Sequence, residues 1–358
     1  MTPKAALAHI RQICCLGLGG EAIMPTLLRE LHDLVPCDSG GFFWVDESGE
    51  MTNLYAERLL PCEAMAIYFT RFYDGGTQPF RMEFTRRVKG GAPLAASSFS
   101  DEFYRSDYYN LIWRHFDAHH ALYAIISEHG RPLGQLSLYR ARKDPPFNAA
   151  DQERLGSVVR YIAHGLTTAD QPGNGFDEGP DGQSGLIIFD GEGQLIHASP
   201  QGRRLLFLAT YARIARDTLG NGRDGIPPAL VNLCHSLDRV FQDGDAPPPV
   251  LKVQNSWGSF VFRAYWMEPG AEGGRIGVTV QHRELLPVAL VAGMKPLPLS
   301  PKQREVALLL ALGKTHQNIA QRLNVSLNTA NYHVKQVYDK LDAHDRQDVL
   351  KTLLPKPV

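Results

Sequence analysis

Apolar residues recur with helical spacing near the end of the chain, and capping residues divide them into four short segments. Ser300, Pro301 and Gln303 form a capping box with proline in the first helical turn, and Gly313 stands where that helix should end. Three further polar residues precede apolar segments and can cap the helices that follow: Thr315, Ser326 and Asp345. The pattern predicts four helices joined by tight turns.

The third of these helices, which should run from Ser326 to about Leu341, is strongly amphipathic. At a helical period of about 100° per residue, one apolar stripe collects Ala330, Val334, Val337 and Leu341. The opposite face carries Asn328, Asn331, Tyr332, Lys335 and Asp339. Because the apolar stripe must pack against the other helices, we expect the polar face to be exposed.

The side chains on this polar face suit double-stranded DNA. Asparagine can pair with adenine through two hydrogen bonds, and lysine can donate to guanine or to a phosphate. A helix that presents such side chains in its first turns fits the major groove. Candidates for phosphate contacts, which position a protein without reading sequence, are Thr329, Lys314, Lys340 and Arg346. The plain alternative is a helical domain with a solvated polar face.

The segment from Leu299 to Val349 resembles the LuxR-type (GerE-type) helix-turn-helix family. The spacing is kept without gaps, and the matching residues are Leu299-Ser300, Arg304-Glu305-Val306, Gly313, Ile319-Ala320, Leu323, Val325-Ser326, Thr329, His333, Tyr338, Lys340-Leu341 and Arg346. The resemblance implies an all-α domain of four helices over residues 296–358.

The resemblance also implies how this domain would meet DNA. In the geometry of the family, Asn331, Tyr332 and Lys335 face the groove. The family usually has Val-Lys after the threonine, and this chain has Ala330-Asn331 there, so the base read at this position is expected to differ. Family members bind two-fold-related half-sites as homodimers, partly through the last helix, here residues 345–354.

Ahead of this domain, strand and helix patterns alternate in two blocks. Residues 1–166 combine amphipathic helices with a strand hairpin, which predicts an α+β domain, and Asp101–His115 is expected to form one aromatic-rich helix. Residues 167–184 are rich in Gly, Pro and Asp and are predicted to be a linker. Residues 185–290 open with two short strands around a turn at Asp190–Gly193 and are predicted to form a second α+β domain.

Both blocks resemble sensor domains. The first is similar to GAF-like domains of LuxR-type regulators over residues 100–122, 132–142 and 145–166. The second is similar to a PAS-like domain through its opening strands and the helix that follows them. The expected fold class is therefore a multidomain chain, with two α+β sensor domains (GAF-like and PAS-like) followed by an all-α four-helix LuxR-type domain.

Aromatic side chains are dense in the first block. Sensor domains of both kinds commonly hold a small molecule between the sheet and its covering helices. Candidate ligand contacts are Trp44, Tyr68, Phe72, Tyr104, Tyr108 and Trp113. Such a lining suits a small apolar or aromatic ligand, although the same residues could fill an ordinary core. The tryptophan and aspartate pattern of acyl-homoserine-lactone receptors is not apparent, so that ligand is not assigned.

The charge distribution fits a nucleic-acid binder joined to an acidic body. From Lys295 onward, ten Lys and Arg residues accompany five Asp and Glu residues, a net charge of +5. Because the whole chain carries −1, residues 1–294 carry −6. The sequence shows neither a signal peptide nor an apolar run of membrane-spanning length, so a cytoplasmic protein without a membrane partner is expected.

Cysteine, histidine and aspartate patterns predict no metal, no cofactor and no catalytic constellation. The five cysteines lack metal-like spacing and are expected to be free thiols, with redox sensing by Cys14 and Cys15 as the alternative. His119 and its histidine neighbours are too few to define a metal site. Asp190 lacks the early acidic pair of a phosphorelay receiver domain.

These features predict a one-component transcriptional regulator rather than an enzyme. It should bind a two-fold DNA site as a homodimer under control of a small molecule at the N-terminal domains, with RNA polymerase as a further candidate partner. Two alternatives stay open. The N-terminal blocks could be protein-interaction modules, or an enzyme fused to a DNA-binding domain.

Overall fold

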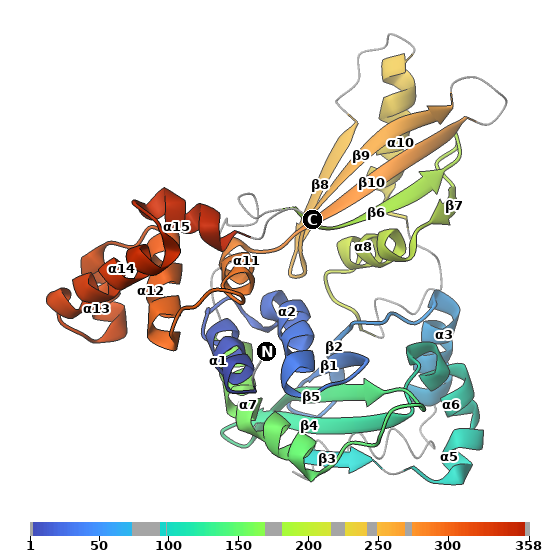
Figure 1. Ribbon diagram of the computed structural model, residues 1–358. Coiled ribbons are helices and arrows are strands. Elements are labelled where there is room, and N and C mark those ends of the chain that lie inside the picture. The colour runs from blue at the N-terminus through green and yellow to red at the C-terminus, as the bar shows by residue number, and fades with distance from the viewer. Residues whose placement is uncertain are drawn as a thin grey trace.

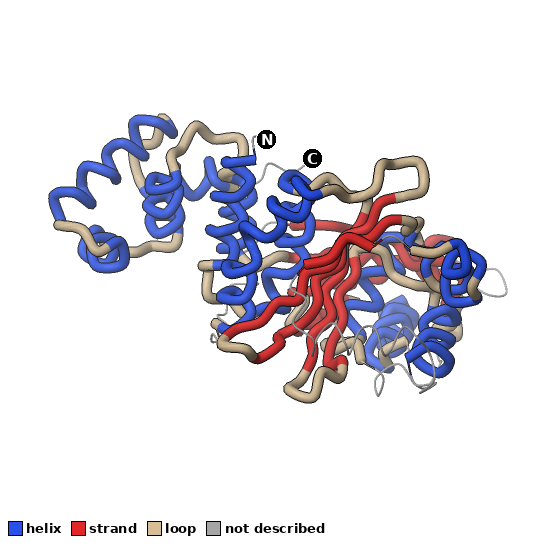
Figure 2. The backbone as a smooth tube through the Cα atoms, turned by 90° about the horizontal axis from the view of Figure 1, so that it is seen from below, coloured by secondary structure: helices blue, strands red, loops and turns tan. Residues whose placement is uncertain are grey.

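The computed structural model describes residues 3–73, 94–97, 99–168, 181–215, 226–241, 249–268 and 274–354. Within these residues the chain forms two α+β regions followed by a group of helices (Figure 1). The C-terminal helices lie at one end of the molecule, clear of both sheets, in two perpendicular views (Figures 1 and 2). No described helix has the length and apolar character needed to cross a membrane. The predicted class, two α+β domains followed by an all-α domain, is confirmed.

The first region is built on a five-stranded antiparallel sheet in the order β2-β1-β5-β4-β3. Its strands are β1 (Ser39–Val45), β2 (Met51–Ala56), β3 (Leu94–Ser97), β4 (His120–Glu128) and β5 (Arg131–Arg140). Successive side chains of a strand point to opposite faces. Phe42 and its cross-strand partner Leu136 are fully buried on one face, so Phe43 and its partner Gln135 lie on the other.

Helices cover both faces of this sheet. The face that carries Phe42 packs against α2 (Gly20–Leu34) and α7 (Ala149–Thr167), and α1 (Pro3–Cys14) packs on these two helices. The other face is covered by α3 (Cys62–Ile67), η1 (Tyr68–Tyr73), α5 (Asp101–Arg105), α6 (Asp107–Leu111) and η2 (Trp113–Phe116). The prediction of one helix over Asp101–His115 is wrong. The chain turns at Ser106, whose hydroxyl caps a new helix by accepting a hydrogen bond from Tyr109 N.

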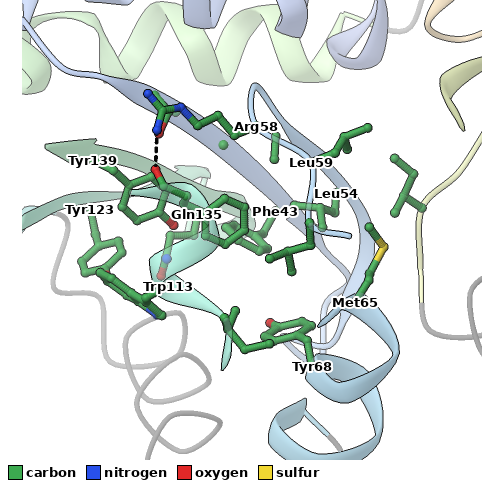
Figure 3. Close-up of a pocket in the computed structure, with 18 of the residues that line it drawn as sticks. Phe43, Leu54, Arg58, Leu59, Met65, Tyr68, Trp113, Tyr123, Gln135 and Tyr139 are labelled. Atoms are coloured by element: carbon green, nitrogen blue, oxygen red, sulfur yellow. Dashed lines mark hydrogen bonds between the residues drawn. The ribbon is translucent and has the colours of Figure 1, made fainter. Parts of the chain in front are cut away.

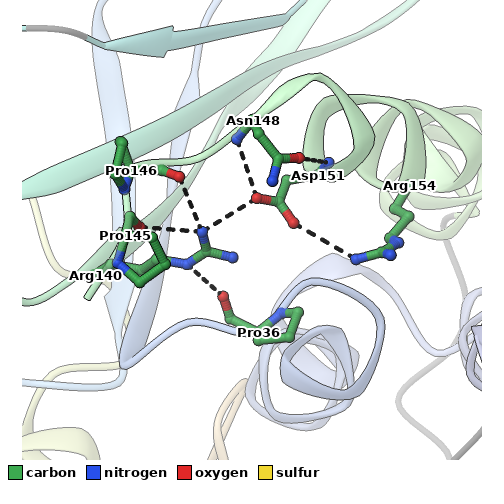
Figure 4. Close-up of polar contacts among 7 residues, drawn as sticks. All are labelled: Pro36, Arg140, Pro145, Pro146, Asn148, Asp151 and Arg154. Carbon is green, nitrogen blue, oxygen red and sulfur yellow. Dashed lines mark hydrogen bonds and ion pairs between the residues drawn. The ribbon is translucent and has the colours of Figure 1, made fainter.

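A buried ion pair fixes the start of α7 to the sheet (Figure 4). Arg140 Nη1 lies 3.1 Å from Asp151 Oδ2, and the two side chains are only 9% and 5% exposed. Arg140 Nε also donates to the carbonyl of Pro36 at 2.8 Å. Asp151 completes a capping box with Asn148 at the first turn of α7. The pair therefore joins β5, the loop before β1 and α7.

The second region repeats this strand order. Its sheet runs β7-β6-β10-β9-β8, again the second, first, fifth, fourth and third strands along the chain. Its elements are β6 (Asp181–Phe189), β7 (Leu195–Ala198), α8 (Pro200–Thr210), α10 (Pro228–Phe241), β8 (Val250–Asn255), β9 (Gly258–Glu268) and β10 (Arg275–Arg283). The turn predicted at Asp190–Gly193 is present, because Asp190 Oδ1 accepts from Gln194 N at 2.7 Å. Most of the predicted linker, residues 169–180, lies outside the described residues.

Helix α11 (Leu286–Gly293) leads into the C-terminal helices. These are α12 (Pro301–Ala311), α13 (His316–Leu323), α14 (Leu327–Leu341) and α15 (Arg346–Leu353). All four predicted caps are present, because each side chain accepts a hydrogen bond from a backbone N–H in the first turn: Ser300, Thr315, Ser326 and Asp345. Gly313 follows α12 at a φ of 79°, a conformation that glycine adopts without strain.

Candidate DNA-binding surface and ligand pocket

Helix α14 separates an apolar stripe from a polar face, as its sequence predicts. The stripe is buried against the neighbouring helices and consists of Ala330, Val334, Val337 and Leu341. The polar face is exposed and includes Asn328, Asn331, Tyr332 and Lys335. Tyr332 is 61% exposed, so a large aromatic surface stands beside two amides and an ammonium group. These groups can donate and accept hydrogen bonds and can stack.

Helix α13 lies against α14 and holds one of these side chains. Asn324 ends α13 in the left-handed conformation, at a φ of 49°, and starts the tight turn into α14. His316 Nδ1 lies 2.8 Å from Asn331 Oδ1. Since an amide oxygen only accepts, the histidine donates, and the Asn331 amide keeps its two N–H donors. Paired recognition of adenine uses both amide atoms, and the Asn331 oxygen has a second lone pair, so it can accept from adenine while it still accepts from His316.

The four candidate phosphate contacts divide into two pairs. Thr329 in the first turn of α14 and Lys314 just before α13 are exposed. Lys340, in contrast, donates from Nζ to two acceptors at the start of α12, each at 2.9 Å. Arg346 donates to the carbonyl of Ala311 at the end of α12, at 3.4 Å. Phosphate binding by Lys340 or Arg346 would have to compete with these contacts within the fold.

A cavity lies between the first sheet and the short helices that cover it (Figure 3). It contains about 890 Å³ of space, its open mouth included. Three of the six predicted ligand contacts line it: Tyr68, Tyr108 and Trp113. Other apolar and aromatic wall residues include Phe43, Leu54, Leu60, Met65, Ile112, Phe116, Tyr123 and Tyr139. An apolar concave wall of this kind is typical of small-molecule sites.

Trp44 was predicted as a ligand contact but does not line the cavity. It follows Phe43 on β1, and Phe43 points into the cavity, so Trp44 points to the opposite face of the sheet. There its ring lies 4.7 Å from that of Phe42, centroid to centroid, and 6.0 Å from that of Trp257 in the second region. Its contacts are therefore with the core and with the neighbouring region.

Phe72 and Tyr104 also lie outside the cavity lining. Phe72 packs edge-on against Tyr108, with ring centroids 5.0 Å apart, and supports the wall from behind. Tyr104 stacks on His119 at 4.2 Å, and its hydroxyl donates to the His119 carbonyl at 3.1 Å. Phe72 takes the core-filling role that aromatic density in the sequence left open, whereas Tyr104 is only partly buried.

Three polar side chains reach the cavity, and sequence reasoning missed all of them. Gln135 and Ser39 are 3% and 2% exposed, and the Gln135 Oε1 and Ser39 Oγ atoms have no hydrogen-bond partner among the described residues. The Gln135 Nε2 group donates to Ser137 Oγ at 3.0 Å. Arg58 lies at the mouth and donates to the Phe116 carbonyl at 2.9 Å (Figure 3). The cavity thus has neutral polar groups inside and a cation at its edge.

The phenols in the wall are neutral as well. Burial raises the pKa of the Tyr68 and Tyr108 hydroxyls above their ordinary value. Among the described residues that line the cavity, Arg58 alone carries a charge. A charged group of a ligand would therefore be stabilised only at the mouth.

The C-terminal helices match a known family. Residues 297–353 fit the family model described as "Bacterial regulatory proteins, luxR family". These residues form a LuxR-type helix-turn-helix domain. A curated relative, "Probable transcriptional regulatory protein SgaR" of Hyphomicrobium methylovorum, is 30% identical over 110 residues, which are 30% of this chain and 52% of the relative. The chain thus spans about half the length of that relative.

Solved structures give only distant likenesses. A "GAF domain/HD domain protein" from Geobacter sulfurreducens is 14% identical, and the match covers 42% of this chain and 93% of that one at a TM-score of 0.32. Escherichia coli SdiA is 13% identical, with 88% and 82% of the two chains covered at a TM-score of 0.24. At these scores neither likeness decides the fold or the function of the N-terminal regions.

Charged side chains attach the segment just before the LuxR-type domain to the first region. Lys295, between α11 and α12, lies 2.9 Å from Glu30 Oε2 and also pairs with Asp33, both on α2. The ring of His9 on α1 is buried, and its Nε2 atom lies 3.5 Å from Oε2 of the same Glu30. Helix α11 itself packs on α1, α12 and α15. Helix α11 and Lys295 thus connect the first region to the LuxR-type domain.

The second region grips the edge strand of the first. Arg204 of α8 donates to the Ala56 carbonyl at 2.8 Å and to the Tyr55 hydroxyl at 2.6 Å. The backbone N–H of Ile214 donates to Asn53 Oδ1 at 2.9 Å. All three acceptors lie on β2, so this strand is shared between the cavity wall and the neighbouring region.

The structure also assembles a cysteine, a histidine and a carboxylate that are scattered in the sequence. His32 Nε2 lies 2.8 Å from Glu57 Oε2, and the Cys37 thiol is hydrogen-bonded to the same ring. These hydrogen bonds, first to Cys37 and then to Glu57, raise the pKa of His32 to about 10. Burial raises the pKa of the Cys37 thiol above its ordinary value. The thiol is therefore protonated at neutral pH, unlike the thiolate of a catalytic cysteine.

Proposed function

We propose that this protein is a one-component transcriptional regulator that acts in the cytoplasm. The exposed polar face of α14, backed by a fully buried apolar stripe within a LuxR-type domain, carries this proposal. A homodimer would place two copies of α14 in successive major grooves of a two-fold DNA site. Helix α15 is the proposed dimer contact, and RNA polymerase is a further proposed partner.

Within the DNA-binding surface we assign different roles to different residues. Asn331, Tyr332 and Lys335 would read base edges, and Asn328 would lie beside them in the first turn. Thr329 and Lys314 would contact phosphates, because both are exposed near the start of a helix. The proposed domain bounds are 1–166 for the GAF-like sensor, 185–290 for the PAS-like sensor and 296–358 for the DNA-binding domain, and the signal would bind in the first.

Lys335→Ala tests this proposal, with Lys4→Ala, an exposed lysine at the start of α1, as a matched loss of charge. The operator would first be selected from random DNA with the full-length protein. If Lys335 contacts a base edge, as proposed, Lys335→Ala should weaken operator binding by about 5- to 150-fold. If it contacts a phosphate instead, the slope of log affinity against log salt concentration should fall by about one. Equal operator affinity of the two variants, with both folded, would contradict the assignment of the α14 face.

A further inference from the structure

We infer that the cavity of the first region binds one small aromatic molecule with two polar ends. The inner end carries a hydroxyl or N–H hydrogen-bond donor, and the outer end carries a carboxylate or carbonyl. This inference rests on the proposed function, because it describes the signal to which the regulator responds. It follows from the cavity wall, its unpartnered buried atoms and the cation at its mouth.

The wall selects a flat apolar body. Rings from three different elements face the space: Phe43 from β1, Tyr68 from η1 and Trp113 from η2. Aromatic rings pair best in offset or edge-to-face arrangements. A planar aromatic ligand can form such pairs with several of these rings at once. Leu54 and Met65 add apolar surface to the wall, and the flexible methionine side chain can adapt to the shape of a ligand. An aromatic ligand would bury most of its surface here.

The interior of the cavity favours a ligand with a hydrogen-bond donor. A buried polar atom left without a partner costs roughly 1–3 kcal/mol, so such atoms are rare in folded proteins. Two of them, Gln135 Oε1 and Ser39 Oγ, belong to side chains that line the same cavity. The amide oxygen can only accept, and its own amide nitrogen already donates to Ser137. A ligand hydroxyl or N–H would satisfy Gln135, and the Ser39 hydroxyl could accept or return a hydrogen bond.

The mouth of the cavity favours a ligand group that accepts hydrogen bonds or carries a negative charge. Arg58 lines the cavity, and one of its five N–H groups donates to the Phe116 carbonyl. The Asp117 carboxylate lies 3.9 Å away and is 69% exposed, so water weakens that pair. The planar guanidinium can therefore turn N–H donors to a ligand carboxylate or carbonyl. A cationic ligand would meet repulsion there, and no described residue of the cavity lining carries a negative charge.

The second region completes the site. Ile214 lines the cavity, although it belongs to the chain after α8. Its backbone N–H is held by Asn53 of β2. Along this strand Leu54 and Ala56 face the cavity, while Asn53 and Tyr55 hold the second region. A ligand that shifts β2 would therefore change the contacts of both regions at once.

Calorimetric titration of the full-length protein tests the ligand class. The probes are 4-hydroxybenzoate and indole-3-carboxylate, which have both polar ends, benzoate, which lacks the donor, and tyramine, which is cationic. We expect one site per chain, with benzoate about 10-fold weaker than 4-hydroxybenzoate because Gln135 stays unpaired. Tyramine should bind more weakly still. Failure of both donor-bearing acids to bind at millimolar concentration, or tighter binding of tyramine, would overturn the inference.

Two variants connect the binding to the named residues. Gln135→Met should remove the preference for 4-hydroxybenzoate over benzoate, and Arg58→Met should weaken both acids by a similar factor. Arg160→Met, an exposed change on α7, is the matched control and should leave all affinities unchanged. If Gln135→Met does not fold, Arg58→Met at the partly exposed mouth still tests the inference, because unchanged affinity for both acids would contradict it. Operator binding by the ligand-free protein is measured separately, so a failed ligand assay with intact DNA binding rejects only this inference.

Discussion

At the scale of single residues, position on a helix was easier to predict than position around a cavity. The exposure of Lys335 and the burial of Val334 follow from local periodicity, which needs no tertiary information. Phe43 and Trp44 are neighbours with similar side chains, and only the register of β1 against β5 decides which of them enters the cavity. A signal for Gln135 existed, because Gln135 and Ser137 alternate with leucines along a strand.

His32 gives a residue-scale prediction about pH. Its pKa rises from 6.5 to about 10 in the fold, through hydrogen bonds to Cys37 and Glu57. The protonated ring is thus favoured in the folded state, so this contribution to stability is full below pH 6.5 and is lost as the pH rises toward 10. His32→Gln should flatten that alkaline decline in the free energy of unfolding, measured with urea at several pH values. His164→Gln, on the exposed side of α7, is the control, and equal slopes in all three proteins would refute the prediction.

At the scale of elements, helices with complete start and stop signals were predicted correctly, and short aromatic segments were not. The four C-terminal helices begin at the residues that their caps indicate. The segment after Asp101 has good helical periodicity, but Ser106 offers the backbone a competing cap and the helix restarts there. The pair of Arg140 and Asp151 could not be foreseen either, since its value depends on burial that only the packed structure creates.

That buried pair gives an element-scale prediction. Asp151→Asn leaves Arg140 charged and enclosed without an anionic partner, which typically costs about 3–5 kcal/mol of unfolding free energy. Asp107→Asn removes the partner of Arg71 in an ion pair whose side chains are 64% and 54% exposed, and should cost less than about 1 kcal/mol. Chemical denaturation followed by circular dichroism measures both. Similar losses in the two variants would mean that α7 does not depend on the pair.

At the scale of the whole molecule, contacts join the first region, which contains the cavity, to the second region and to the segment that leads into the LuxR-type domain. The second region contacts β2 through Arg204, and Lys295, just before the LuxR-type domain, pairs with carboxylates of α2 in the first region. Because packed interfaces switch between discrete arrangements, a ligand can act at a distance if it binds two arrangements with different affinity. None of these contacts was predictable from the sequence, since each joins residues far apart in the chain.

The buried histidine at this interface gives a prediction for the whole molecule. Burial lowers the pKa of His9 below its ordinary 6.5 and outweighs the nearby Glu30 and Asp33 carboxylates of α2, while Lys295 and Arg304 lower it further. The neutral ring of His9 is thus favoured while α1 and α2 contact the segment around Lys295. His9 binds a proton more readily once that contact opens and exposes the ring to water. The contact should therefore lose stability as the pH falls through about 6.5, the ordinary histidine value.

Small-angle scattering of the full-length protein at pH 8 and pH 5.5 measures this opening. The wild-type protein should expand at the lower pH, because protonated His9 would leave its buried site and release the hold of α1 and α2 on the LuxR-type domain. His9→Leu, which places an apolar side chain of similar size in that site, should stay compact at both pH values. His164→Leu, an exposed change on α7, should expand like the wild type. Equal expansion of all three proteins would place the acid-sensitive group elsewhere, and expansion of none would show that the interface tolerates the charge.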